Sequence, residues 1–266
     1  MSAKSSIKAH RHLGKTATLA AHAKPARNYR WSMLIALPMW VLIVFVVSNL
    51  LISALLWALS VLNIPLDSYI RPAIFQTAIA TLVYALTIAI VIGAPYILRR
   101  RKTSLKVIGL DRLPSWTDIG LAPLVFIGYT LVVTVVLALV TAWIPAFPAD
   151  QVQDIGFKAF GTRADNILAF ITLVVLAPLA EETLFRGYLY GKLKGHVPAI
   201  AAAVATSLLF GIAHLQWNVG IDVFVLSLAL CGLRSLTGSI WSGVLVHMVK
   251  NGIAYYFLFI NPLLGG

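Results

Sequence analysis

Long apolar runs dominate this chain of 266 residues and leave little choice of architecture. Hydrophobic residues make up 60% of the sequence and charged residues only 11%, a balance outside that of soluble globular domains. The runs are also too long for the ten-residue alternating strands of a membrane β-barrel. The sequence therefore predicts an all-α, polytopic integral membrane protein, a bundle of about seven transmembrane helices. The expected spans are residues 31–62, 72–98, 118–144, 166–193, 198–217, 221–236 and 238–260.

Basic residues alternate between rich and poor loops and predict the orientation of the spans. Residues 1–30 carry Lys and Arg but no acid, and another basic cluster, residues 99–102, follows the second span. The positive-inside rule then places the N-terminus in the cytoplasm of a multi-pass protein of the cell inner (cytoplasmic) membrane. We expect residues 1–30 to be a disordered cytoplasmic arm. The first run, residues 31–62, is too long for a cleaved signal peptide and is expected to stay as a signal anchor.

The net charge of +12 does not point to nucleic acid, because the Lys and Arg residues cluster beside the apolar runs. The expected surroundings are therefore a lipid bilayer, with no nucleic acid partner. The single cysteine, Cys231, excludes an intrachain disulfide framework and a multi-cysteine zinc site.

Two adjacent carboxylates, Glu181 and Glu182, lie inside the fourth expected span and are followed by Arg186. Charges in hydrocarbon are costly unless they are paired, hydrated or used. Glu182 and Arg186 are four residues apart, so they share a helix face that suits an ion pair. Glu181 points about 100° away from Glu182 and is left as a candidate general base. Pro178 lacks a backbone donor and is expected to kink the helix and free a carbonyl before the pair.

Two further spans bring polar side chains to a similar depth. His214 lies one turn beyond Phe210 at the end of the fifth span, and His247 and Asn251 share one face of the seventh. The helical rise places Glu181, His214 and Asn251 roughly 20 to 24 Å, and His247 roughly 14 Å, from the inner ends of their helices. We therefore expect one site, with Phe210 as an apolar wall and with His247 and Asn251 orienting water or polarising a carbonyl.

Structural and transport functions are the alternatives to catalysis at this site. A Glu–Arg pair or a histidine in a span often serves only helix packing, as in a non-enzymatic scaffold. Buried carboxylates and histidines also build proton relays, but a proton-coupled transporter usually contains paired repeats, and the glutamate pair has no second copy. Two other ions in the spans are assigned no catalytic role. Lys250 is expected to pair with a carbonyl or carboxylate, and Arg234 to snorkel as an anchor.

The polar residues also form three motifs that resemble a known family. The run APLAEETLFRGYL, residues 177–189, is similar to the Glu-Glu-x-x-x-Arg signature of the CPBP family (CAAX protease and bacteriocin-processing, also called Abi). Phe210 and His214 match its Phe-x-x-x-His motif, and His247 and Asn251 match its third motif.

The resemblance covers about residues 165–260 and divides the chain into N-terminal transmembrane helices, 31–160, and a CPBP-like intramembrane protease core, 161–266. It implies an endopeptidase like the type II CAAX-prenyl endopeptidases, acting on a peptide or membrane-protein substrate that is prenylated and CAAX-like or bacteriocin-like. A bacteriocin-immunity protein is the non-enzymatic alternative within the family. The implied roles are water activation by Glu181 and His214, support by Glu182, Arg186 and Phe210, and oxyanion stabilisation or metal binding by His247 and Asn251.

The sequence does not contain the His-Glu-x-x-His motif of a zincin. Glu181, His214 and His247 would nevertheless be the ligands if zinc were used. The metal-free route is favoured, because the amide of Asn251 is a poor zinc ligand and a good oxyanion donor. We therefore expect no cofactor, with zinc as the alternative.

Overall fold

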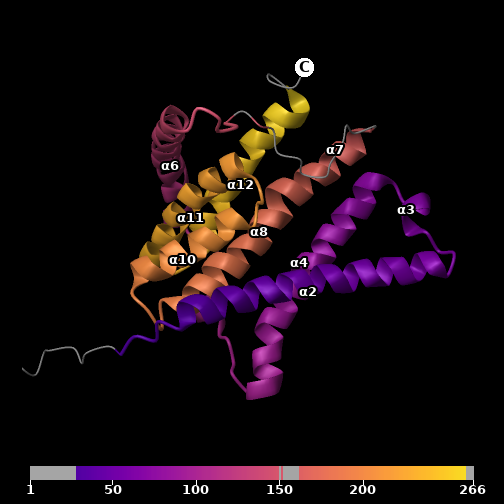
Figure 1. Cartoon of the computed structure of the whole chain (residues 1–266), viewed down its shortest axis with the longest axis horizontal. Coiled ribbons are helices and arrows are strands. Elements are labelled where there is room, and N and C mark those ends of the chain that lie inside the picture. The colour runs from indigo at the N-terminus through magenta and orange to yellow at the C-terminus, as the bar shows by residue number, and fades with distance from the viewer. Residues whose placement is uncertain (1–27, 150, 152–161, 262–266) are drawn as a thin grey trace, which may run out of the picture. The chain divides into compact units, whose positions relative to one another are not determined.

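The computed structural model describes residues 28–149, 151 and 162–261, and this part of the chain is helical and contains no strand (Figure 1). The expected all-α membrane bundle is therefore confirmed. The expected arm, residues 1–30, lies outside the described residues except for 28–30. The helices are α2 (Met33–Val61), α3 (Leu66–Tyr69), α4 (Pro72–Arg99), α5 (Leu105–Ile108), α6 (Trp116–Trp143), α7 (Arg163–Phe170), η1 (Ile171–Leu176), α8 (Ala177–Glu182), η2 (Thr183–Tyr190), α9 (Gly191–Leu193), α10 (Ala199–Ile212), α11 (Trp217–Thr237), α12 (Trp241–Tyr255) and η3 (Tyr256–Ile260).

Six helices among the described residues are long and apolar enough to cross a membrane, and each lies within a few residues of an expected span. They confirm a multi-pass membrane protein, while its orientation and the membrane that holds it stay predictions. The six are residues 33–61, 72–99, 116–143, 163–193, 217–237 and 241–260.

The fifth expected span is the exception. We expected a helix from about Pro198 to beyond His214, but α10 ends at Ile212 and has 14 residues. At 1.5 Å per residue it is about 21 Å long, against about 30 Å of hydrocarbon. Leu215 has a φ of 54°, so the chain turns sharply before α11 begins. A leucine rarely adopts this left-handed conformation, and the apolar sequence here gives no sign of the turn.

The continuous helix from α7 to α9 lies between two groups of helices (Figure 1). On one side α4 contacts α7 and α8, and α2 packs along α4. On the other side α12 contacts η1 and α8, while α10 contacts η2 and α11. The glutamate pair at the end of α8 is therefore surrounded by helices from both halves of the chain.

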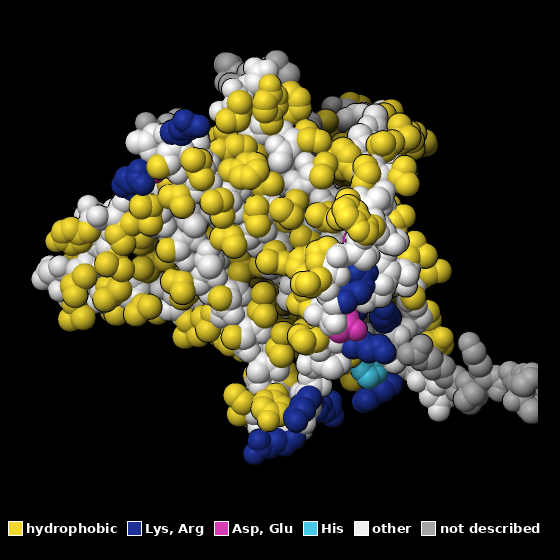
Figure 2. Space-filling model, turned by 180° about the vertical axis from the view of Figure 1, so that it is seen from behind, with side chains coloured by type: hydrophobic (Ala, Val, Ile, Leu, Met, Phe, Trp, Pro, Cys, Tyr) yellow, Lys and Arg dark blue, Asp and Glu magenta, His cyan; other side chains and the backbone are white. Residues whose placement is uncertain are grey.

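The surface and the interior have the polarity expected of a protein in lipid. Figure 2 shows a face covered mostly by hydrophobic side chains, with Lys and Arg gathered chiefly along its lower edge. The buried residues, by contrast, include charged and polar side chains such as Glu182, Arg186 and His247. In this interior Glu182 forms ion-pair contacts with Arg186 and His247.

The expectation that Arg234 snorkels as an anchor was wrong. Its side chain is buried and does not snorkel to the interface. Its Nη2 donates to the carbonyl oxygen of Val107 at 2.9 Å. Gly109 makes room for this contact, since a Cβ there would lie 2.7 Å from Cζ of Arg234. Arg234 therefore fastens the connection between α4 and α6 to α11, a contact that hydropathy cannot reveal.

Candidate active site

Two π-helical segments, η1 and η2, flank the short α8 that carries Glu181 and Glu182. π-Helical turns are rare and are frequent at functional sites. In η1 the hydrogen bonds run from residue i to i−5, as in the bond from Ala177 N–H to the Thr172 carbonyl. The next such bond would need an N–H on Pro178, which proline does not have. The carbonyl of Leu173 is therefore released from the helix, as expected from Pro178.

The side chain of Asn251 supplies a hydrogen-bond donor to this released carbonyl. Its Nδ2 donates to the Leu173 carbonyl oxygen at 2.9 Å. The amide nitrogen carries two hydrogens, so one holds the π-helical turn and the second remains for another acceptor. The structure thus gives Asn251 a local supporting contact that the sequence did not predict, and its role as an oxyanion donor stays a prediction.

The expected ion pair between Glu182 and Arg186 is present and fully buried. Arg186 Nη1 lies 2.9 Å from Glu182 Oε1, and both side chains have no exposed surface. The guanidinium also lies over the ring of Phe210, 4.3 Å from its centroid. Gly243 on α12 allows the carboxylate to approach, because a Cβ there would lie 3.0 Å from Glu182 Oε2. The pair therefore joins η2, α10 and α12 at one point.

Phe210 does more than form an apolar wall. Its ring is packed edge-to-face against the imidazoles of His214 and His247, with centroid separations of 5.0 and 6.0 Å. Edge-to-face contacts of this kind fix ring orientation. Phe210 therefore packs against both histidines and against Arg186.

Both histidines are held by Nδ1 and present Nε2 to the site. His214 Nδ1 lies 2.8 Å from the carbonyl oxygen of Phe210, and His247 Nδ1 lies 3.0 Å from Glu182 Oε1. A carbonyl oxygen only accepts, so Nδ1 of His214 carries the proton and its Nε2 is the acceptor in the neutral ring. His247 lies between two carboxylates, with Nε2 3.8 Å from Glu181 Oε2. When protonated, it donates from both nitrogens.

Glu181 is the more accessible of the two glutamates, as expected, with 16% of its side chain exposed. It lines a cavity of about 270 Å³ between α2, α4, α8, η2 and α10. The polar side chains in this cavity are those of Glu181, His214 and Tyr84, and the remaining walls are apolar, including Phe45 of α2. The structure thus brings six of the expected site residues into one chain of contacts, with Asn251 one turn from His247: Glu181, Glu182, Arg186, Phe210, His214 and His247.

Tyr84 is the site residue that the sequence analysis missed. Its hydroxyl donates to Glu181 Oε1 at 2.5 Å. One signal was available, because Tyr84 lies roughly 18 Å along α4 from Pro72, whereas tyrosines of spans favour the membrane interfaces. A tyrosine at mid-span needs a partner for its hydroxyl. Its partner could not have been named from the sequence.

The three candidate zinc ligands do not form a ligand set as they lie. Among the described residues, no three His, Cys, Asp or Glu side chains are grouped to hold a metal ion. One oxygen of Glu181 is bonded to Tyr84, and the other lies 3.8 Å from His247 Nε2. Participation of zinc therefore stays a prediction, to be tested by chelation.

A second polar cluster confirms the expectation for Lys250. Its Nζ lies 3.2 Å from Asp222 Oδ2, and the hydroxyl of Tyr129 donates to Oδ1 of the same carboxylate. This cluster joins α6, α11 and α12. It does not line the cavity at Glu181, so we assign it to helix packing.

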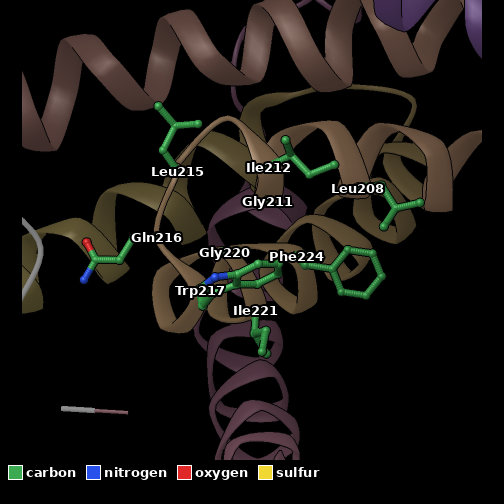
Figure 3. Close-up of a pocket in the computed structure, with 9 residues that line it drawn as sticks. All are labelled: Leu208, Gly211, Ile212, Leu215, Gln216, Trp217, Gly220, Ile221 and Phe224. Carbon is green, nitrogen blue, oxygen red and sulfur yellow. The ribbon is translucent and has the colours of Figure 1, made fainter. Parts of the chain in front are cut away.

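A larger hollow of about 500 Å³ lies between α10 and α11 (Figure 3). The two helices meet closely here, since a Cβ on Gly211 would lie 2.8 Å from the carbonyl oxygen of Gly220. The labelled lining is apolar except for Gln216, and it contains no glutamate or histidine. We therefore place the candidate active site in the smaller cavity.

Comparisons with known proteins agree with the position of this site. Residues 163–253 match the family model described as Rce1-like, type II CAAX prenyl endopeptidase. An uncharacterized 24.3 kDa protein of Escherichia coli is 32% identical over 119 residues, which cover 42% of this chain and 54% of that protein. The chain thus spans about half the length of this curated relative. No solved structure matches the chain.

Proposed function

From the match of residues 163–253 to the family model described as Rce1-like, type II CAAX prenyl endopeptidase, we propose that this chain is an intramembrane endopeptidase. The match supports the family to which the three motifs pointed. One observation carries the proposal beyond the family. Burial of the Glu182–Arg186 pair leaves Glu181 facing a cavity that it shares with a histidine. This arrangement supports hydrolysis by an activated water at membrane depth.

In the proposed reaction, a water lies between Glu181 Oε2 and the Nε2 atoms of the histidines. A separation of 3.8 Å between Glu181 and His247 is too long for a direct hydrogen bond and suits a bridging molecule. Glu181, aided by the acceptor Nε2 of His214, takes a proton from the water as its oxygen attacks the scissile carbonyl. Protonated His247 and the second N–H of Asn251 donate to the oxyanion. Glu181 then returns the proton to the leaving amine as the C–N bond breaks.

The substrate class follows from the location of the cavity. Apart from Tyr84, Glu181 and His214, its walls are apolar and come partly from α2 and α4. We propose a membrane-associated peptide as substrate, either with a prenylated CAAX-like terminus or bacteriocin-like. The proposal is tested with purified protein in lipid nanodiscs and a peptide panel containing prenylated and unprenylated members. Cleavage of none of them, by a folded protein, would favour the non-enzymatic scaffold or immunity protein.

Chelation separates the metal-free route from zinc catalysis. We expect that cleavage persists after exhaustive dialysis against a strong chelator, because Glu181 activates the water and the histidines act as an acceptor and a donor. The metal content of the same sample is measured alongside. Loss of activity that zinc restores, with about one equivalent bound, would assign His214, His247 and Glu181 as zinc ligands.

Replacing Asn251 by alanine tests its two proposed contacts. We expect kcat per folded molecule to fall about a hundredfold, with little change in KM, because an oxyanion donor is lost. We also expect a loss of stability of about 1–3 kcal/mol, because the Leu173 carbonyl loses its donor. Steady-state kinetics and thermal unfolding in detergent measure the two effects. Normal turnover in a destabilised variant would restrict Asn251 to support of η1.

A further inference from the structure

Tyr84 is bonded to the candidate general base from outside the segment that matches the family. It lies on α4, whereas the match begins at residue 163. Its hydroxyl donates to Glu181 Oε1 at 2.5 Å, and its side chain lines the same cavity as Glu181 and His214. The cavity at Glu181 is therefore incomplete without the N-terminal helices.

Helix packing alone does not account for this hydrogen bond. The contact of α4 with the α7–α9 helix already has a neutral polar pair, in which the hydroxyls of Thr77 and Thr172 lie 2.9 Å apart. Another hydroxyl of α4, that of Thr87, is satisfied by the Val83 carbonyl of its own helix. Only Tyr84 among these polar groups reaches a carboxylate.

The geometry fixes how the two oxygens of Glu181 are used. Oε1 accepts from Tyr84, and Oε2 lies 3.8 Å from His247 Nε2. A carboxylate held at one oxygen cannot rotate freely about its last bond, so the other oxygen keeps facing the histidines. Alignment of this kind matters, because a displacement of about 1 Å at a reacting group lowers rates on the order of a hundredfold.

We propose that Tyr84 is a positioning residue for hydrolysis, which holds Glu181 Oε1 so that Oε2 faces the attacking water. This inference rests on the proposed function. It extends the functional unit to α4, so the segment that matches the family does not by itself contain the complete site. Tyr84 keeps its proton throughout, and the proton of the water goes to Oε2.

The test compares Tyr84→Phe with wild type in the full chain, using the peptide that wild type cleaves best. We expect kcat to fall about tenfold to a hundredfold while KM changes less than about twofold, because Glu181 loses alignment but substrate contacts remain. Tyr96→Phe, on the same helix but exposed and away from the cavity, is the matched control and should behave as wild type. Unchanged kcat in a folded Tyr84→Phe variant overturns the inference.

A double variant shows whether Tyr84 acts through Glu181. In the Glu181→Gln background, adding Tyr84→Phe should lower the residual rate by less than about twofold, because the residue being positioned has lost its function. Losses that multiply would show that Tyr84 acts independently and would overturn the inference.

If the Tyr84→Phe variant does not fold, a second substitution at the same position tests the inference. 4-Aminophenylalanine at position 84 keeps a weaker donor in the same place, and should give an intermediate kcat with unchanged KM. A kcat equal to that of wild type would contradict the inference. A wild-type chain that cleaves nothing removes the proposed function and the inference together. An active wild type with an active Tyr84→Phe variant removes the inference alone.

Discussion

Replacing Glu181 by glutamine is expected to reduce cleavage to a small residual rate while leaving the folded yield nearly unchanged. Glutamine has the same shape and keeps an oxygen that accepts from Tyr84, but it cannot take a proton from water. General base catalysis typically contributes 10²- to 10⁴-fold, so we expect a loss of about a thousandfold or more. The buried Glu182–Arg186 pair is left intact, so size-exclusion profiles and unfolding temperatures should match those of wild type.

A surface carboxylate supplies the control for this variant. Asp67→Asn in α3 removes an acid at an exposed position and should leave the rate unchanged. An active Glu181→Gln variant would overturn the assignment of the general base. The catalytic role would then have to be sought on His214, which shares the cavity with Glu181.

The sequence predicted those parts of the fold that depend on local composition. Six spans lie within a few residues of their expected limits, because apolar length alone determines them. The predicted end of the fifth span was wrong. The turn at Leu215, which follows α10, depends on a backbone conformation that leucine seldom adopts. The prediction that Arg234 snorkels was also wrong, because its partner carbonyls belong to the distant α4–α6 connection.

The same distinction applies to the site. The Glu182–Arg186 pair could be predicted, because a spacing of four residues along one helix places both side chains on the same face. The contacts of Tyr84 with Glu181 and of Asn251 with Leu173 join helices that are far apart in sequence. A single sequence does not specify which faces of two such helices meet. Motif spacing therefore identified the helices that meet at the site, and only the structure identified the hydrogen bonds between them.

Replacing Arg186 by methionine is expected to lower the folded yield severely. The guanidinium is the cation beside Glu182 Oε1 at 2.9 Å, and neither side chain is exposed. Without it, Glu182 loses the guanidinium and keeps only its contact with His247 Nδ1 at 3.0 Å, at a cost on the order of 3–5 kcal/mol. This cost is a large part of the stability of a typical domain. Folded yield in detergent and the thermal unfolding midpoint measure the loss.

Removing both charges should restore much of that loss. In the double variant Glu182→Gln with Arg186→Met, no unpaired charge remains, and the glutamine oxygen still accepts from His247 Nδ1. Replacing both members of a buried ion pair together often leaves the folding stability nearly unchanged, because the cost of desolvating two charges is removed as well. We therefore expect the double variant to fold better than Arg186→Met alone. A double variant as unstable as the single one would mean that Arg186 stabilises the bundle through its contact with the Phe210 ring, 4.3 Å away, and not through the charge of Glu182.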